Sequence, residues 1–134
     1  MRMIEFIKKN NLIYAQIIRS NYKSKTGINF FTSPKLNQQV AYMSHKTGHK
    51  ITPHYHNNIV RKIKGSSEVL IILSGIMKAN FYDKKKYLFK KVILKKGDII
   101  ILLNGSHGFE IIKRCKFLEV KQGPFVQSKD KVKF

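Results

Sequence analysis

Residues 68–82 read Glu-Val-Leu-Ile-Ile-Leu-Ser-Gly-Ile-Met-Lys-Ala-Asn-Phe-Tyr, and this stretch decides the fold class. Its two apolar halves, 68–73 and 77–82, are separated by the turn signal Ser74-Gly75. The pattern therefore predicts two short strands joined by a turn. Because strand side chains alternate between the two faces of a sheet, Leu70 and Ile72 are expected on the face of Glu68.

The rest of the chain repeats this pattern, with short runs of Ile, Val, Phe and Tyr between turn signals. Further strands are expected at 12–19, 27–32, 39–45, 51–56, 87–94, 99–103, 107–113 and 117–121. Residues 1–10 are expected to start as a helical turn. Strands at such regular spacing indicate an all-β antiparallel sandwich or small barrel, of which the jelly roll is one form.

The histidines supply the clearest chemical signal. In an extended strand, His54 and His56 would project from one face, which is a chelating arrangement. Glu68 and His107 complete a candidate set of three nitrogens and one oxygen, suited to Fe(II), Mn(II), Ni(II) or Zn(II). Glu68 is either a fourth ligand or an acceptor that orients a ligating imidazole.

Other residues outside this set are expected to be structural. His45 and His49 have no partner at a matching spacing. The single cysteine, Cys115, lies between Arg114 and Lys116 and is expected to be a packed thiol. These positions therefore carry no catalytic prediction.

Two groups of these residues resemble the motifs of the cupin family. The first motif is matched by Gly48, His54, His56, Glu68 and Gly75, although eleven residues separate His56 from Glu68 where three or four are usual. The second motif is matched by Gly97-Asp98, Gly105 and His107, with Leu103 in place of the usual proline. The resemblance covers 38–122 and implies a double-stranded β-helix, the jelly-roll barrel of cupins.

The resemblance also implies a pocket around a divalent metal ion. We expect Leu70, Ile72 and Phe109 to form an apolar wall, with the hydroxyl of Tyr42 available to a ligand. Arg61 is either an anion contact at the pocket mouth or a solvated loop residue.

The chain is also similar to small cupins that accompany surface-polysaccharide and nucleotide-sugar pathways. That similarity implies a sugar-derived or carboxylate ligand and, if turnover occurs, metal-dependent isomerisation or epimerisation. A cupin that binds such a ligand without turnover is the alternative. Iron-dependent oxygenation is permitted by the ligand set, but no co-substrate motif favours it.

The net charge of +20 raises nucleic-acid binding as a further hypothesis. Of the 27 basic residues 23 are lysines, and they are dispersed over turns and strand ends, whereas recognition of phosphates and bases favours arginine. We therefore expect a small-molecule ligand rather than nucleic acid. The positive field would still draw anionic small molecules toward a cavity.

Length and composition set the remaining expectations. At 134 residues the chain is expected to be one domain, with an N-terminal strand arm (1–37), a metal-motif core (38–122) and a C-terminal arm (123–134). One cysteine excludes an internal disulfide, no apolar run approaches the length of a membrane span, and no signal peptide is recognisable. We expect a cytoplasmic protein that forms a homodimer, with 12–18 and 28–31 as candidate dimer surfaces.

Overall fold

The computed structural model describes residues 2–127 and 130–134. Within them the regular elements are all strands: β1 (Ile4–Lys9), β2 (Leu12–Ile18), β3 (Gly27–Phe30), β4 (Ala41–Ser44), β5 (Glu68–Tyr82), β6 (Leu88–Lys95), β7 (Ile99–Leu102) and β8 (Ser106–Lys121). The all-β prediction is confirmed. No helix in the described part of the chain is long and apolar enough to cross a membrane.

The described chain divides into two compact units. The first contains residues 1–22 and 66–134, and the second contains residues 23–65. The first unit holds β1, β2 and β5 to β8, whereas the second holds the β3–β4 pair.

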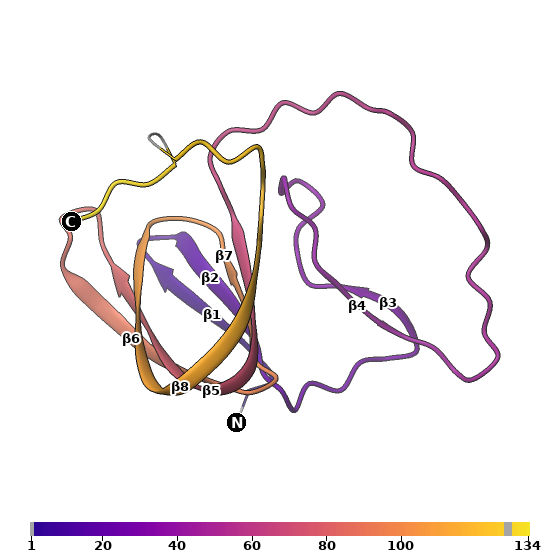
Figure 1. Ribbon diagram of the computed structural model, residues 1–134, viewed down its shortest axis with the longest axis horizontal. Coiled ribbons are helices and arrows are strands. Elements are labelled where there is room, and N and C mark those ends of the chain that lie inside the picture. The colour runs from indigo at the N-terminus through magenta and orange to yellow at the C-terminus, as the bar shows by residue number, and fades with distance from the viewer. Residues whose placement is uncertain (1, 128–129) are drawn as a thin grey trace. The chain divides into compact units, whose positions relative to one another are not determined.

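The first unit is a single antiparallel sheet that curls into a half-barrel (Figure 1). Its path runs β1-β2-β7-β5-β6, and β8 pairs with the other edge of β5. β6 pairs with the C-terminal half of β5, and β7 pairs with the N-terminal half. β6 and β7 therefore act as one interrupted strand opposite β5. The half-barrel agrees with the predicted antiparallel all-β architecture. The double-stranded β-helix of cupins is a more specific fold and stays a prediction.

The curl depends on a bulge in the middle of β5. Before the bulge, Leu70 and Ile72 are buried in the core, whereas after it the buried side chains are those of Met77, Ala79 and Phe81. The core-facing positions thus change from even to odd numbers. The pairing of β5 with β8 is irregular over the same residues. An extra residue in one strand has this effect, because it bends the strand and shifts by one the positions whose side chains point to the core.

Gly75 makes the bulge possible. Its φ angle is +80°, and a Cβ atom added to it would overlap the carbonyl oxygen of Arg114 in β8. Only glycine adopts this conformation without cost and leaves room for the neighbouring backbone.

The concave side of the sheet carries the hydrophobic core. Every strand of the first unit except β8 contributes buried side chains, and β8 adds the partly buried Phe109 and Cys115. Cys115 is a free thiol packed against this core, as predicted.

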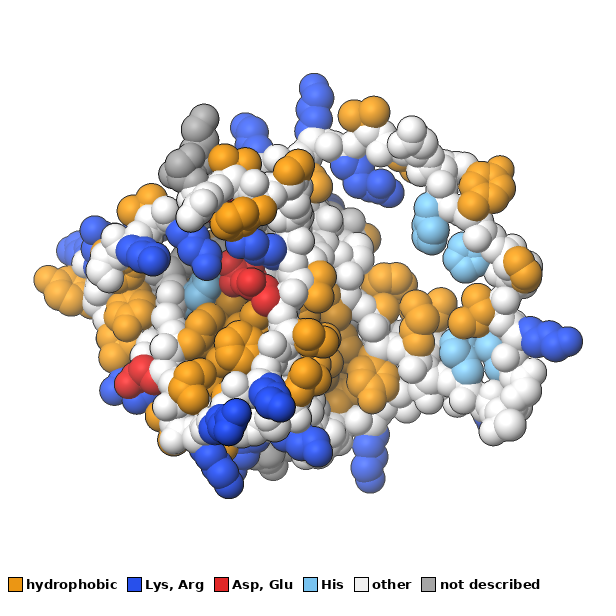
Figure 2. All heavy atoms as spheres, viewed as in Figure 1, with side chains coloured by type: hydrophobic (Ala, Val, Ile, Leu, Met, Phe, Trp, Pro, Cys, Tyr) orange, Lys and Arg blue, Asp and Glu red, His pale blue; other side chains and the backbone are white. Residues whose placement is uncertain are grey.

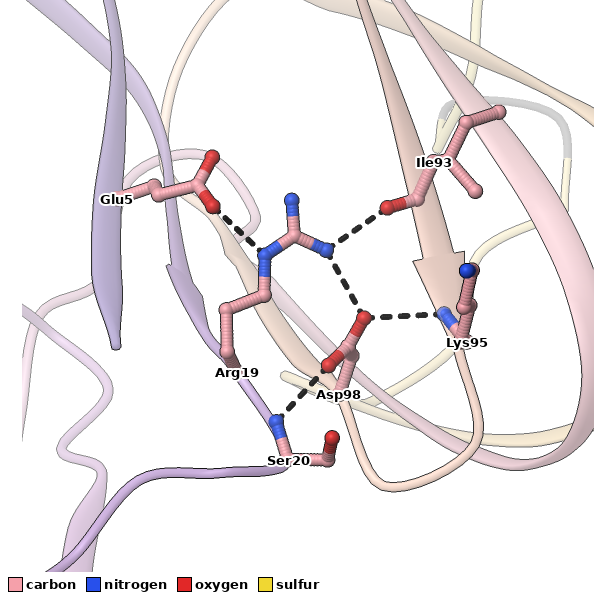
Figure 3. Close-up of polar contacts among 6 residues, drawn as sticks. All are labelled: Glu5, Arg19, Ser20, Ile93, Lys95 and Asp98. Atoms are coloured by element: carbon pink, nitrogen blue, oxygen red, sulfur yellow. Dashed lines mark hydrogen bonds and ion pairs between the residues drawn. The ribbon is translucent and has the colours of Figure 1, made fainter. Parts of the chain in front are cut away.

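A buried polar network fixes the turn between β6 and β7 (Figure 3). Asp98 is 3% exposed, and its carboxylate accepts hydrogen bonds from the Arg19 side chain and from the backbone N–H groups of Ser20 and Lys95. Arg19 also donates to the Glu5 carboxylate at 2.7 Å and to the Ile93 carbonyl at 2.8 Å. β1, the end of β2 and the β6–β7 turn are therefore connected through one guanidinium.

The second unit contains a short antiparallel pair in which Gly27 of β3 lies opposite Ser44 of β4. The loop between these strands is held by polar side chains. Thr32 donates to the Gln39 side-chain oxygen, and the Gln39 amide donates to the carbonyls of Ser33 and Leu36. The remainder of the unit, 45–65, contains no strand.

Several strand predictions need correction. Residues 4–9 form β1 instead of a helical turn, because the two-residue turn Asn10-Asn11, with both φ angles positive, closes a hairpin with β2; Met1 lies outside the described residues. The expected strand at 51–56 is absent. Pro53 has no N–H to donate, and no neighbouring strand pairs with this segment.

The strands expected at 68–73 and 77–82 are one bent strand, β5, and those at 107–113 and 117–121 are one strand, β8. The turn signal Ser74-Gly75 marks the bulge instead of a chain reversal. In the C-terminal arm, Ser128 and Lys129 lie outside the described residues.

We predict that Gly75→Ala lowers the free energy of unfolding by about 3 kcal/mol or more, because the methyl group adds a backbone clash to an unfavourable φ angle. Gly65→Ala is the matched control. Gly65 has a φ angle of +73° with open space around it, so this variant is expected to lose about 1 kcal/mol. Urea unfolding followed by circular dichroism measures both, and equal losses would contradict the role assigned to Gly75.

Candidate functional site

Glu68 and His107 both point to the concave side of the half-barrel. Glu68 shares its face of β5 with the buried Leu70. His107, near the start of β8, lies opposite the fully buried Phe81 in the β5–β8 register. Directly paired residues of neighbouring strands share a face, so both ionisable groups face the core.

The two side chains meet across the bend. His107 Nε2 lies 3.6 Å from Glu68 Oε2. However, the register partner of His107 is Phe81, thirteen positions along β5 from Glu68, which would be about 43 Å in a straight strand. The contact therefore exists only because β5 and β8 fold back on themselves as a U, as Figure 1 shows.

The surroundings of Glu68 favour its ionised form. The neighbouring His107 imidazole lowers the pKa of the Glu68 carboxyl, against the opposing effect of partial burial. Glu119 and Lys121 lower this pKa further. Lys121 lies opposite Glu68 in the β5–β8 register and also pairs with Asp130 at 2.6 Å. The site is thus a small charged cluster at the rim of an apolar core.

The predicted apolar wall lies beside this cluster. Leu70 and Ile72 are each 1% exposed, and Phe109 packs against the same core. The ring of Phe109 is 5.4 Å from that of His107. Ile111 lies opposite the buried Met77 yet is 54% exposed, so the concave side is open along β8. Figure 2 shows hydrophobic side chains in this hollow, with acidic side chains and a histidine beside them.

His54 and His56 lie in the strandless part of the second unit and are both exposed. Their ring centroids are 5.3 Å apart, with the planes at 71°. His54 Nδ1 lies 2.8 Å from the carbonyl oxygen of Thr52. If Nδ1 donates in this contact, Nε2 is free to bind a metal ion, an arrangement common among metal-binding histidines.

The other two predicted site residues also belong to the second unit. Tyr42 is in β4, 39% exposed, and its ring packs edge-on against Phe31 at 6.3 Å. Arg61 is exposed in the strandless 45–65 segment. Their contributions to a ligand pocket stay predictions.

Glu68 and His107 are spaced as two donors of one metal ion. Donors about 2.1 Å from a tetrahedral ion would be about 3.4 Å apart, close to the 3.6 Å between Nε2 and Oε2. No group of three or more His, Cys, Asp or Glu side chains within residues 2–127 and 130–134 is placed to hold an ion. The proposed four-ligand set is divided between the two units, two donors in each.

The predicted site did not include Lys121, which lies opposite Glu68 in the β5–β8 register and pairs with Asp130. The alternation of β8 offered one signal, because Lys121 shares its strand face with Glu119. The proximity of Lys121 to Glu68 depends on the register of β8 against β5, which the sequence alone does not give.

In comparisons with known proteins, the chain matches no family model, no curated protein and no solved structure. The resemblance to cupins therefore rests on the motif residues alone and stays a prediction.

We predict that Glu68→Gln reduces stability in a pH-dependent way. Because the pKa of Glu68 is lower in the folded than in the unfolded chain, ionisation stabilises the folded state above the ordinary value of 4.5, and this contribution is lost as pH falls through the folded pKa. The free energy of unfolding of wild type should exceed that of the variant by about 1 kcal/mol at pH 5.5, and the difference should be lost as pH falls below 4.5 and through the lowered pKa of the folded state. Urea unfolding across this range measures it.

The control is the same substitution in a His107→Ala background. With the imidazole gone, Glu68→Gln is expected to have a smaller, nearly pH-independent effect, since His107 is the largest cause of the pKa shift. An undiminished pH dependence in that background would show that the pairing of Glu68 with His107 is unimportant.

Proposed function

We propose that this protein is a cupin-type, metal-binding half-barrel that binds a small sugar-derived or carboxylate ligand. The observation that carries the proposal is the approach of His107 to Glu68, 3.6 Å apart across the bend, beside the apolar wall of Leu70 and Ile72. A nitrogen and an oxygen donor beside an apolar hollow are typical of sites that hold an ion and a small organic molecule.

In this proposal, Glu68 and His107 of the first unit hold a divalent ion (Fe, Mn, Ni or Zn). His54 and His56 of the second unit stay candidate donors. The ion would supply Lewis acidity toward a carbonyl or hydroxyl of the ligand. The protein would supply the donors, the ionised state of Glu68 and an apolar wall that limits access of water.

The ligand class follows from charge and shape. Eight basic residues and no acidic residue lie in 23–65, so the second unit attracts anions. Near Glu68, Lys121 adds a cation at the rim of the hollow, and Arg61 remains a candidate anion contact. Phosphorylated sugars and small carboxylates combine a negative group with a compact body, and the resemblance to polysaccharide-pathway cupins supports the same class.

Binding without turnover is the alternative, and one observation favours it. The ionisable groups nearest the hollow are already paired, Glu68 with His107 and Lys121 with Asp130. A general base must be free to accept a proton from the ligand. In the proposal Glu68 and His107 are occupied as donors to the ion, so neither is free to act as that base.

The proposal retains a cytoplasmic homodimer, with one change to its contact surface. β2 is paired on both sides, by β1 and β7, and its residues 14–18 are buried, so 12–18 does not offer a dimer surface. Ile28 and Phe30 in β3 are 58% and 62% exposed and remain the candidate contact.

We predict that protein purified without chelator carries about one divalent ion per chain and that His107→Ala loses most of it. The double variant His54→Ala/His56→Ala tests the two candidate donors of the second unit. Elemental analysis by mass spectrometry measures the content. The matched control is His45→Ala/His49→Ala in the same unit. Those rings stack in parallel, 4.1 Å apart, so their nitrogens do not converge on one point, and metal content should be unchanged.

Equal, negligible metal in all four proteins would contradict the metal assignment. Loss in His107→Ala but not in His54→Ala/His56→Ala would show that His54 and His56 are not ligands of this ion.

We predict saturable binding of an anionic sugar derivative by calorimetry, weakened at least tenfold by His107→Ala. Incubation of a panel of nucleotide sugars in heavy water then separates the two versions of the proposal, because an isomerase or epimerase exchanges a carbon-bound proton. Binding without exchange would favour the ligand-binding version, whereas no binding across the panel would contradict both.

A further inference from the structure

The tips of two hairpins in the first unit border a second hollow. The β1–β2 turn contributes Asn10 and Asn11, and the β5–β6 turn contributes Asp83, Lys84 and Lys85. The hollow has a volume of about 460 Å³, within the range of small-molecule sites. Neither Glu68 nor His107 borders it.

The side chain of Lys9, which borders this hollow, is held by two contacts. Its ammonium lies 2.7 Å from the Asp83 carboxylate and 5.0 Å from the centre of the Phe89 ring. A lysine held on two sides loses less conformational entropy when it binds an anion than a freely moving lysine does.

Asp83 fixes the backbone of the β5–β6 turn and does not form an ion pair with the lysines of that turn. Its carboxylate accepts hydrogen bonds from the backbone N–H groups of Lys85 and Tyr87 in addition to Lys9. Within the described residues, Lys84 and Lys85 are exposed and form no ion pair. Three lysines and one carboxylate border the hollow, so its net charge is positive.

The other residues that border the hollow are polar and apolar. Asn10 and Asn11 border it, and a side-chain amide donates hydrogen bonds to anionic oxygens. Leu12 and the buried Tyr14 also border it, and the Tyr14 ring packs edge-on against Phe89 at 4.9 Å.

We infer that this hollow binds a small phosphate monoester. The phosphate is held by the ammonium groups of Lys84 and Lys85 together with the Asn10 and Asn11 amides, and the organic part rests on Leu12 and Tyr14. Lys9 adds positive charge from the side. The inference is independent of the metal site, because it uses none of the proposed ligands.

The test is a titration of ¹⁵N-labelled full-length protein with inorganic phosphate and with phenyl phosphate, in 150 mM salt, followed by amide chemical shifts. Saturable shifts are expected at residues 10–12 and 84–85. Phenyl phosphate should bind at least threefold more tightly than inorganic phosphate, because its ring is expected to contact Leu12 and Tyr14.

The double variant Lys84→Gln/Lys85→Gln is expected to weaken binding of both compounds at least tenfold. Its control, Lys90→Gln/Lys91→Gln, removes the same charge from two exposed positions on β6 that do not border the hollow, and should change affinity less than twofold. Equal weakening by both variants would show attraction to the overall charge, and no saturation below 10 mM would show that no site exists. Either result would overturn the inference.

Discussion

The structure of the first unit depends on one local constraint, the bulge at Gly75 in the middle of β5. The backbone of β8 passes so close at Arg114 that no side chain fits on residue 75, and the left-handed φ angle also requires glycine. The bulge moves the buried face from even to odd residues, which lets a fifteen-residue strand bend while keeping one continuous core. Without it, the two ends of β5 would lie far apart.

The interrupted partner strand is the counterpart of that bend. β6 and β7 follow the two halves of β5, and the turn between them is fixed by Asp98, whose carboxylate accepts hydrogen bonds from Arg19, Ser20 and Lys95. A buried carboxylate without hydrogen-bond donors is unstable, so Asp98 favours the one arrangement of the chain that supplies its three donors. The β2 end and the turn are thus held in a single geometry.

The proposed metal and ligand site depends on the same geometry. The bend brings His107 to Glu68, and it places both beside Leu70 and Ile72, so that charge and apolar surface meet at one rim. Most acidic residues are used in ion pairs of this kind, such as Asp83 with Lys9 and Asp130 with Lys121. The unpaired positive charge that remains explains why both proposed ligands are anionic.

The sequence by itself determined the strand class, most strand positions, the free packed thiol and the pairing of apolar Leu70 and Ile72 on one face, because these depend on local composition and on the two-residue period of strands. The hairpin at Asn10-Asn11 was missed, because residues 1–10 were expected to start as a helical turn and the pairing of β1 with β2 is not visible in either segment alone. Only the tertiary structure decided that Ser74-Gly75 bends a continuous strand, that 51–56 is not a strand, and that His107 lies beside Glu68. Strand pairing, register and close approach of backbones are long-range relations, which a single strand's pattern does not encode.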